Sequence, residues 1–248
     1  MLGMSGGVDS SVAALLLKNA GYDVTGVTLR LRPDRYMEQC VSGGCCSIDD
    51  IDDARRVAYK LGIEHLVFNF TDIFEETVID YFVKEYEQGR TPNPCIACNR
   101  HVKFNAMMKR AIELGFDYVA TGHYAYIEQN EQGRWLDSQE ICFVPDKDYA
   151  GFIERYTGKK AEPGQFVDEN GTVLGTHKGI AHYTIGQRKG LGISFGEPMF
   201  VTKIDAAQNQ IVLGKAGSQY AKQLVAGDIN WISIERLTEP LKATAKTR

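Results

Sequence analysis

The first 123 residues alternate between apolar runs suited to buried strands and stretches of helical periodicity, and this alternation constrains the fold most strongly. The strand-like runs lie at about residues 24–31, 65–70 and 118–120. The helical stretches between them end at Gly21, Gly62, Gly89 and Gly115, since glycine suits the position just after a helix. Strands separated by helices predict an α/β domain with a parallel sheet and right-handed crossovers. Ligands of such sheets bind beyond the carboxyl ends of the strands.

The residue composition changes after about residue 145, where glycine and β-forming residues dominate. Turn sequences at 169–171 and 206–209 predict hairpins between short strands. A last strand-like stretch lies at 228–234, and we expect it to begin a further β-structure of which this chain contains only the first part. We therefore expect a second, β-rich region after the α/β domain.

Composition places the chain among ordinary globular proteins. It has 44% hydrophobic and 24% charged residues. Its net charge of −4 argues against a protein that binds nucleic acid over its whole surface. No apolar run reaches the roughly 18 residues that suggest a membrane span, and the N-terminus lacks the pattern of a signal peptide. We expect a cytoplasmic protein without membrane association, and we expect a monomer.

A glycine-rich loop, with the sequence SGGVDSS at residues 5–11, lies between a minimal strand and the first helix. Glycines let backbone amides approach an anion, and the start of a helix adds partial positive charge. No Gly-Lys-Ser/Thr follows, so the loop differs from that of kinases and GTPases. Because a carboxylate beside phosphates is costly unless a cation bridges them, Asp9 predicts a Mg²⁺ ion bound through the phosphates. The alternative to a phosphate-binding loop is a glycine-rich strand-to-helix turn without a ligand.

The loop resembles the SGGxDS signature of the ATP-pyrophosphatase superfamily. That resemblance implies an adenine-nucleotide-hydrolase-like (PP-loop) fold. It also implies cleavage of ATP between its α- and β-phosphates, with AMP left on the substrate and pyrophosphate released.

The cysteines bear on which substrate ATP activates. The chain contains six, at residues 40, 45, 46, 95, 98 and 142, and in a reducing cytosol we do not expect them to be structural disulfides. Cys95 and Cys98 follow two prolines that stiffen their loop. We expect Cys98 near the start of the next helix, at about Asn105, where nearby cations favour the thiolate. A zinc site is the alternative, but no second Cys-x-x-Cys pair exists to complete it.

The spaced motifs together resemble the tRNA-specific 2-thiouridylase family, from Gly3 to about Trp231. They are the phosphate loop, TPNP at 91–94, CN at 98–99, KF at 103–104, ATGHY at 120–124, DS at 137–138, ICF at 141–143 and YTIGQRKGLGI at 183–193. The resemblance implies ATP-dependent 2-thiolation of the wobble uridine (position 34) of tRNA. It also implies a sulfur-carrier protein or a cysteine desulfurase relay as the sulfur source.

The resemblance assigns roles residue by residue. It makes Cys98 the nucleophile and Cys142 the persulfide carrier, ending in a disulfide between them that a cellular reductant resets. Target-base contacts would be Asn93, Pro94 and Cys95, and His123 would contact tRNA. ATP would be surrounded by Gly3, Met4, Ser5, Gly6, Gly7, Val8, Asp9, Ser10, Leu29 and Gly122.

The resemblance also sets the expected domain boundaries. We predict a PP-loop ATP-binding catalytic domain at 1–145, a β-rich tRNA-binding domain at 146–215 and the beginning of a C-terminal β-barrel at 216–248. The family carries several dozen further residues between Trp135 and Leu136, which we interpret as a segment missing from this chain.

One residue departs from the family pattern, since many members carry Asp where this chain has Cys95. Cys95 is then either a weaker general acid/base or, with Cys98 and Cys142, a ligand of an iron–sulfur cluster that activates sulfide. We favour persulfide chemistry over a cluster. Two other functions stay open: another adenylating synthetase of the superfamily, and a nucleotide sensor or tRNA-binding module without catalysis.

Overall fold

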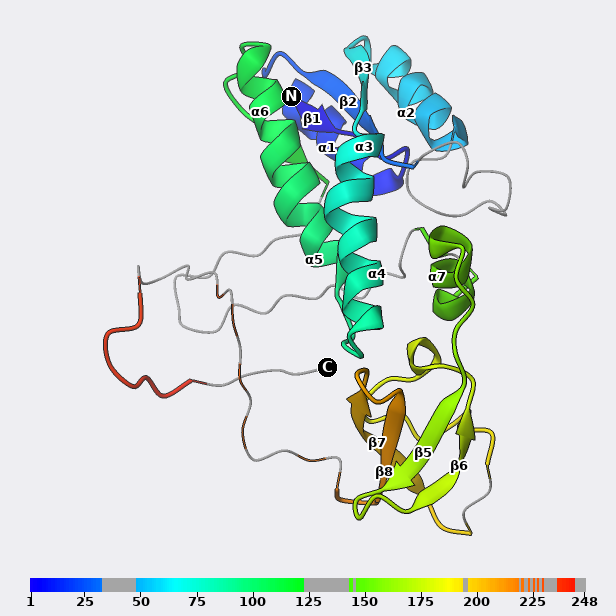
Figure 1. Ribbon diagram of the computed structural model, residues 1–248. Coiled ribbons are helices and arrows are strands. Elements are labelled where there is room, and N and C mark those ends of the chain that lie inside the picture. Colours follow the sequence, from blue (N-terminus) through cyan, green and yellow to red (C-terminus); the bar gives the residue numbers. More distant parts are fainter. Residues whose placement is uncertain are drawn as a thin grey trace.

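The computed structural model describes residues 1–32, 48–122, 143–144, 146–193, 196–218, 220, 223, 225, 227, 229 and 236–243. Figure 1 shows an upper part that contains a sheet flanked by helices and a lower part built mainly of strands. Helix α7 (Tyr149–Thr157) lies between these two parts of the chain in Figure 1.

The upper sheet is parallel throughout, as the strand–helix alternation predicts. Its strands are β1 (Leu2–Gly3), β2 (Thr25–Arg30), β3 (Glu64–Asn69) and β4 (Ala120–Thr121), in the order β3-β2-β1-β4. Leu2 pairs with Gly26 on one side and with Ala120 on the other. The short β1 therefore lies in the interior of the sheet, with strands on both of its sides.

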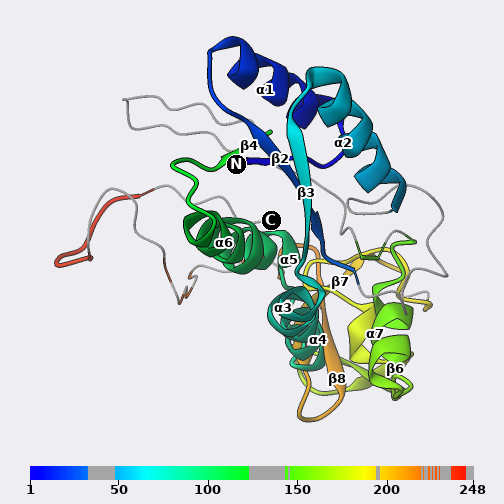
Figure 2. The ribbon, with the colours of Figure 1, turned by 90° about the horizontal axis from the view of Figure 1, so that it is seen from above.

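Helices cover both faces of this sheet. They are α1 (Val8–Asn19), α2 (Ile48–Leu61), α3 (Thr71–Phe74), α4 (Asp80–Glu87), α5 (Pro94–Cys98) and α6 (Met107–Glu113). Figure 2 shows α1 and α2 on one side of the strands, with α3, α4 and α6 on the other. Ala14 and Ala54 pack against Leu2 on the first side, and Met107 and Ala111 pack near Val27 on the second.

Two of the helical segments contain π-helical stretches. The stretch η2 (Glu75–Ile79) joins α3 to α4, so the long helix expected from Thr71 is confirmed. The stretch η3 (Asn99–Ala106) joins α5 to α6. The expected helix start at about Asn105 is wrong, because proline can occupy the first helical turn and the Asn93 side chain caps it by accepting a hydrogen bond from the Ile96 amide at 3.4 Å.

Helix α7 (Tyr149–Thr157) was not expected in the region predicted to be β-rich. Asp148 caps its start by accepting a hydrogen bond from the Gly151 amide at 3.0 Å, and Gly158 ends it in the left-handed conformation with φ of 69°. Its apolar side packs into the aromatic core around α4, where the Phe82 and Phe152 rings lie 6.1 Å apart. The local signals were therefore present in the sequence, but the surrounding strands obscured them.

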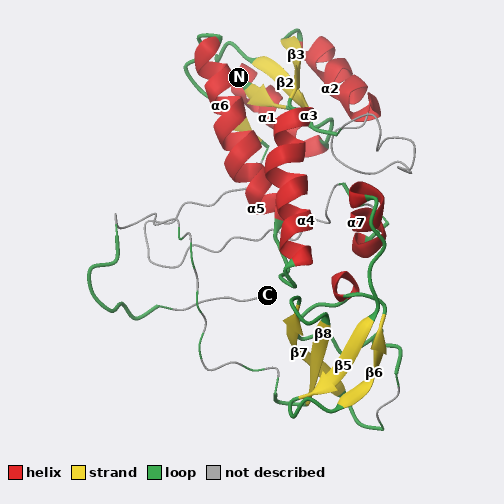
Figure 3. Cartoon of the chain, viewed as in Figure 1, coloured by secondary structure: helices red, strands yellow, loops and turns green. Residues whose placement is uncertain are grey.

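The lower part is a four-stranded sheet, shown in yellow in Figure 3. Its strands are β5 (Gly164–Asp168), β6 (Val173–His177), β7 (Met199–Asp205) and β8 (Gln210–Lys215), in the order β6-β5-β8-β7. The antiparallel pairs β5–β6 and β7–β8 confirm both predicted hairpins. The short 3₁₀ helix η4 (Ile180–His182) follows β6. The domain boundaries stay predictions, and most of 216–248 lies outside the described residues.

A histidine is buried in the lower sheet, at the end of β6. His177 is 1% exposed; its Nδ1 accepts a hydrogen bond from the Gly179 amide at 3.0 Å, and its Nε2 lies 3.2 Å from the Asn209 carbonyl oxygen. Burial lowers the pKa of His177 below its ordinary 6.5, and nearby His182 adds to this effect, although the hydrogen bond to Asn209 opposes it. The folded state therefore prefers the neutral ring.

We expect the free energy of unfolding to be fully supported by His177 above pH 6.5 and to fall as the pH drops below that value, because the unfolded chain binds the proton more readily. Urea titrations between about pH 5 and 8 would measure this slope. The variant His177→Gln should flatten it, whereas the matched change at exposed His182 should keep it. An equal slope in His177→Gln and the parent would contradict the assignment.

Helix α1 exposes a large part of its apolar surface. Ala14 is fully buried, whereas Val8 and Leu16 are 77% and 61% exposed and Val12 and Leu15 are also exposed. Apolar residues thus occur on both sides of α1, the pattern of a helix buried all round, although the described residues cover only one side. Within the described part of the chain, no helix has the length and apolar character needed to cross a bilayer.

Candidate nucleotide and thiol site

The loop between β1 and α1 is held in shape by its own serines. The Ser10 hydroxyl donates to the Gly7 carbonyl oxygen at 3.1 Å, and the Ser11 hydroxyl donates to the same oxygen at 2.8 Å. The Ser5 amide in turn donates to the Ser10 hydroxyl oxygen at 3.3 Å. Ser10 is buried, while Ser5 and Gly7 are exposed. The chain therefore presents a preformed turn of backbone to solvent.

The start of α1 completes this turn. Gly7 is the extended residue before the helix, and no side chain caps the helix there. The first amides of an uncapped helix are suited to receive an anion, which the partial positive charge of the helix end also favours. Val8 and Asp9 are both exposed beside these amides. Residues 5–11 thus have the geometry that the sequence predicts for a phosphate-binding loop.

Two glycines allow other segments to approach the loop closely. Gly6 has φ of +78°, and a Cβ atom there would lie 2.6 Å from the Asp50 carbonyl oxygen of α2. A Cβ atom on Gly122, just after β4, would lie 2.7 Å from the Ser10 nitrogen. Such distances are below any ordinary contact, so only glycine fits at either position. The predicted Gly122 therefore lies directly against the loop.

The loop lies where ligands of parallel sheets usually bind. The chain passes from β1 through α1 to β2 on one side, whereas β4 pairs with β1 on the other side. The direction of winding therefore reverses next to β1, at the carboxyl edge of the sheet. A crevice at such a point is the usual ligand site of an open α/β sheet.

The cysteine segment packs beside the same edge of the sheet. Cys98, at the end of α5, is buried in the core cluster that also contains Leu31, the residue following β2. Leu29, a predicted ATP contact, packs against this cluster. The core therefore brings the cysteine helix next to the carboxyl end of β2.

Cys95 and Cys98 differ in their surroundings. They are three residues apart on α5, a spacing that places side chains on the same side of a helix. Cys95 is half-buried, whereas Cys98 is 7% exposed. Cys98 lies at the end of α5, inside a continuous helical segment, so the expectation that it precedes the next helix is wrong. The half-buried thiol and the buried thiol thus lie on one helix.

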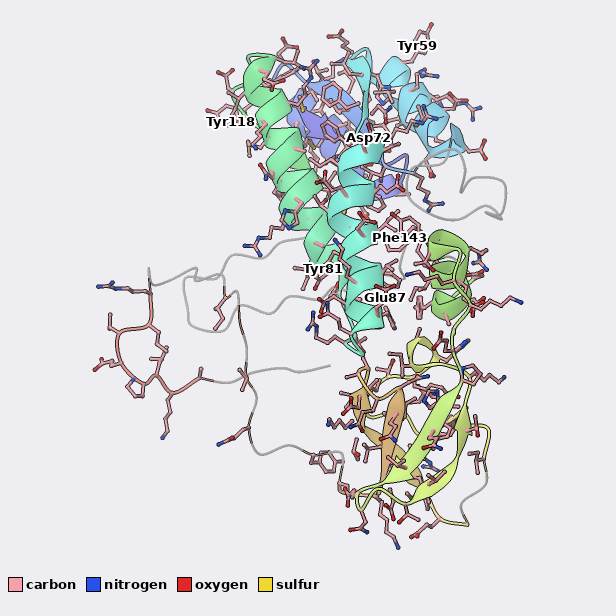
Figure 4. The ribbon with its side chains drawn as sticks, in the orientation of Figure 1. Tyr59, Asp72, Tyr81, Glu87, Tyr118 and Phe143 are labelled. Atoms are coloured by element: carbon pink, nitrogen blue, oxygen red, sulfur yellow. The ribbon has the colours of Figure 1, made fainter. Side chains whose placement is uncertain are left out.

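Phe143 directly follows Cys142 in the sequence and belongs to the same core as Cys98. Its ring lies 5.2 Å from that of Phe82 and 5.3 Å from that of Phe152. Figure 4 shows the labelled Phe143 between α4 and α7. The core therefore ties the segment that follows Cys142 to the helices around Cys98.

Several predicted residues lie outside the described residues. They are Cys40, Cys45, Cys46, His123, Trp135, Leu136 and Cys142. Their predicted roles, and the predicted missing segment between Trp135 and Leu136, remain predictions. Among the described residues, no group of three or more His, Cys, Asp or Glu side chains could hold a metal ion.

Two residues near the loop were missed by the sequence analysis. Buried Thr28 donates a hydrogen bond to the Met4 carbonyl oxygen at 2.9 Å, and the Nε2 atom of His65 lies 2.9 Å from the Thr28 hydroxyl oxygen. Neither residue belongs to a recognised motif. Only the alignment of β2 with β3 brings them together beneath the loop.

Known families match both parts of the chain. Residues 1–137 match a family profile described as the tRNA methyl transferase HUP domain, and residues 150–215 match one described as the tRNA methyl transferase PRC-barrel domain. A tRNA-specific 2-thiouridylase MnmA from Clostridioides difficile is 48% identical, over all of this chain and 83% of its own length. Proteins of the same name from Acetivibrio thermocellus and Halothermothrix orenii are 48% and 42% identical, each over all of this chain and 84% of its own length.

The parallel sheet and its glycine-rich loop define a nucleotide-binding α/β protein of the PP-loop class. Within that class, the relatives decide the family. The chain belongs to the tRNA-specific 2-thiouridylase family. The alignment with the Clostridioides difficile relative runs over 302 positions, more than the 248 residues of this chain, so that relative carries residues without a counterpart here.

Proposed function

We propose that this protein replaces the C2 oxygen of the wobble uridine of tRNA with sulfur, at the expense of ATP. One observation carries the proposal: the phosphate loop follows β1 and the cysteine helix packs against Leu31, which follows β2, so both lie at the carboxyl edge of one parallel sheet. A nucleotide and a reactive thiol can therefore serve one substrate. The relatives carry this activity in their names, which supports the same acceptor here.

ATP binding is the first step of the proposal. The amides of residues 5–10 would receive the pyrophosphate, and Leu29 and Gly122 would lie along the rest of the nucleotide. A Mg²⁺ ion suits this arrangement, because one or two carboxylates together with phosphate oxygens form its usual set of ligands, and Asp9 is exposed beside the loop. Asp9 would hold the ion, which neutralises phosphate charge when it is bound.

Activation of uridine is the second step. The C2 carbonyl oxygen attacks the α-phosphorus of ATP and pyrophosphate leaves, which converts a poor leaving group into AMP. The base has to leave the anticodon stack to reach the site, so residues that contact the splayed nucleotide are required. We assign this contact to Asn93, Pro94 and Cys95 at the start of α5, where Asn93 is exposed, Cys95 is half-buried and Pro94 is buried. We assign a tRNA contact to His123.

Sulfur transfer is the third step. The outer sulfur of a persulfide on Cys142 attacks C2, a carbon–sulfur bond forms and AMP departs. The Cys98 thiolate then attacks the inner sulfur, which breaks the sulfur–sulfur bond and leaves a Cys98–Cys142 disulfide. Alternatively, Cys98 attacks the persulfide first and releases the sulfide that adds to C2. A cellular dithiol must reduce the disulfide in either case.

The thiols also favour sulfur transfer over the methyl transfer in the descriptions of the two family profiles. Methyl transfer has no need of a loop that binds the pyrophosphate of ATP or of a disulfide cycle. The sulfur would be supplied to Cys142 by a carrier protein or a cysteine desulfurase relay.

The test is mass analysis of the wobble nucleoside after incubation of the full chain with unmodified tRNA, ATP, Mg²⁺ and a persulfide donor. We expect 2-thiouridine, with AMP and pyrophosphate formed in equal amounts to it. Formation of AMP without thiouridine would contradict the sulfur-transfer step. Iron in the purified protein, together with activity that is lost when iron is removed, would instead assign the cysteines to a cluster.

A further inference from the structure

A chain of hydrogen bonds runs beneath the phosphate loop from β3 to the end of β1. Thr28 lies in the interior of β2 and is 1% exposed. Its hydroxyl group donates to the Met4 carbonyl oxygen at 2.9 Å. The Nε2 atom of His65, on β3, lies 2.9 Å from the same hydroxyl oxygen. Three strands of the sheet are therefore joined through one side chain.

The direction of each bond in this chain follows from the number of protons. A threonine hydroxyl carries one proton, and Thr28 gives that proton to Met4. The oxygen can then only accept from His65, so the His65 proton must be on Nε2. The Nδ1 atom is buried and has no hydrogen-bond partner among the described residues. Burial lowers the pKa of His65, and nearby Arg55 lowers it further, which maintains the neutral ring.

Met4 is the residue that leads into the phosphate loop. Its amide donates to the Val27 carbonyl oxygen at 2.8 Å, and its carbonyl is held by Thr28. The Met4 carbonyl and the Ser5 amide belong to the same planar peptide unit and point in opposite directions. The bond from Thr28 to the Met4 carbonyl therefore also fixes the orientation of the Ser5 amide. That amide donates a hydrogen bond to the Ser10 hydroxyl oxygen, inside the loop, at 3.3 Å.

We infer that Thr28 and His65 are positioning residues: through the Ser5 amide and the Ser10 hydroxyl group they hold the loop in the shape that receives the pyrophosphate part of ATP. The inference rests on the proposed use of ATP by this loop. It predicts a selective effect, because the loop that this amide holds in shape is proposed to bind the phosphates that ATP carries and AMP lacks. Loss of the Thr28 hydroxyl group would leave the buried Met4 carbonyl without its donor, so this peptide could rotate.

The test compares the binding of ATP and AMP by calorimetry. One hydrogen bond to a charged group corresponds to about 10- to 100-fold in affinity. We expect Thr28→Val to weaken the binding of ATP with Mg²⁺ by about that factor and to leave AMP binding within about twofold. The matched variant Thr28→Ser retains the hydroxyl group and should restore ATP binding to within about threefold of the parent.

The outcomes separate this inference from the proposed function. A parent protein that binds neither nucleotide would contradict the proposed use of ATP. Equal loss of ATP and AMP binding in Thr28→Val, or no loss in a folded variant, would overturn the positioning role. If Thr28→Val does not fold, His65→Leu decides alone, because it removes the donor to Thr28 and should also weaken ATP more than AMP. An unchanged ratio would then overturn the inference.

Discussion

Replacing Cys98 with alanine is expected to lower the rate of 2-thiouridine formation by about 10³-fold or more. Without its nucleophile the enzyme keeps only the part of the rate enhancement that comes from binding the substrates. Exchange of pyrophosphate into ATP in the presence of tRNA should stay within about threefold of the parent, since adenylation precedes sulfur transfer in the proposed mechanism. Both quantities can be measured on one preparation, by nucleoside mass analysis and by incorporation of labelled pyrophosphate.

The neighbouring thiol provides the matched control for Cys98. Cys95 lies three residues away on α5 and is half-buried, so Cys95→Asp changes the same helix without opening the core. If Cys95 acts as an acid or base, this variant should retain thiolation, because a carboxylate can perform that role. Cys98→Ala retaining thiolation at the parent rate would contradict the role of Cys98. Thermal melting of each variant would identify a loss that comes from unfolding.

Replacing Gly122 with alanine is expected to remove nucleotide binding, because the added Cβ atom would lie 2.7 Å from the Ser10 nitrogen and 2.9 Å from the Ser10 Cα atom. Both are backbone atoms at the start of α1, so the helix would have to move away from β4. Such overpacking typically costs about 1–3 kcal/mol of unfolding free energy. Displacement of the loop should weaken ATP binding by at least about tenfold, since tenfold corresponds to only 1.4 kcal/mol.

A second glycine tests whether this effect is specific. Gly227 is exposed, and a Cβ atom there would meet nothing within 4 Å. Gly227→Ala makes the same chemical change and should leave both ATP affinity and melting temperature close to those of the parent. Calorimetry and thermal melting would provide the comparison. Unchanged ATP binding in Gly122→Ala would show that β4 does not support the loop in solution.

The parallel sheet and its phosphate loop were predictable because both leave local signals. Apolar runs marked β2 and β3, glycines marked the helix ends, and the spacing of Gly6, Gly7 and Asp9 marked the loop. Each signal depends on residues close together in the sequence. The fold class and the position of the loop could therefore be read without tertiary information.

The surroundings of Cys98 were harder to predict. The prolines before Cys95 suggested a loop, yet Pro94 occupies the first turn of a helix that continues through a π-helical stretch. Proline can stiffen a loop or begin a helix, and here the side chain of Asn93 caps the helix that Pro94 begins. Helix α7 was missed for a different reason, because the whole region after residue 145 was predicted to be β-rich from its overall composition.

The link between Thr28 and His65 could not have been predicted from either residue alone. It depends on the register in which Gly26 lies beside His65 and Thr28 beside Val67. A shift of one residue would turn the His65 side chain to the opposite face of the sheet. Pairings between distant strands are set by the whole sheet, so the sequence carries no local mark of them.

The apolar side of α1 is expected to contribute to attraction between molecules of this protein in solution. Val12, Leu15 and Leu16 offer neighbouring molecules a surface that gains free energy when water leaves it. A net charge of −4 spread over 248 residues provides only weak repulsion against such attraction. Sulfate or phosphate salts strengthen the attraction, whereas low concentrations of urea weaken it. The apolar side of α1, which the described residues do not cover, is therefore one surface on which the choice of buffer should act.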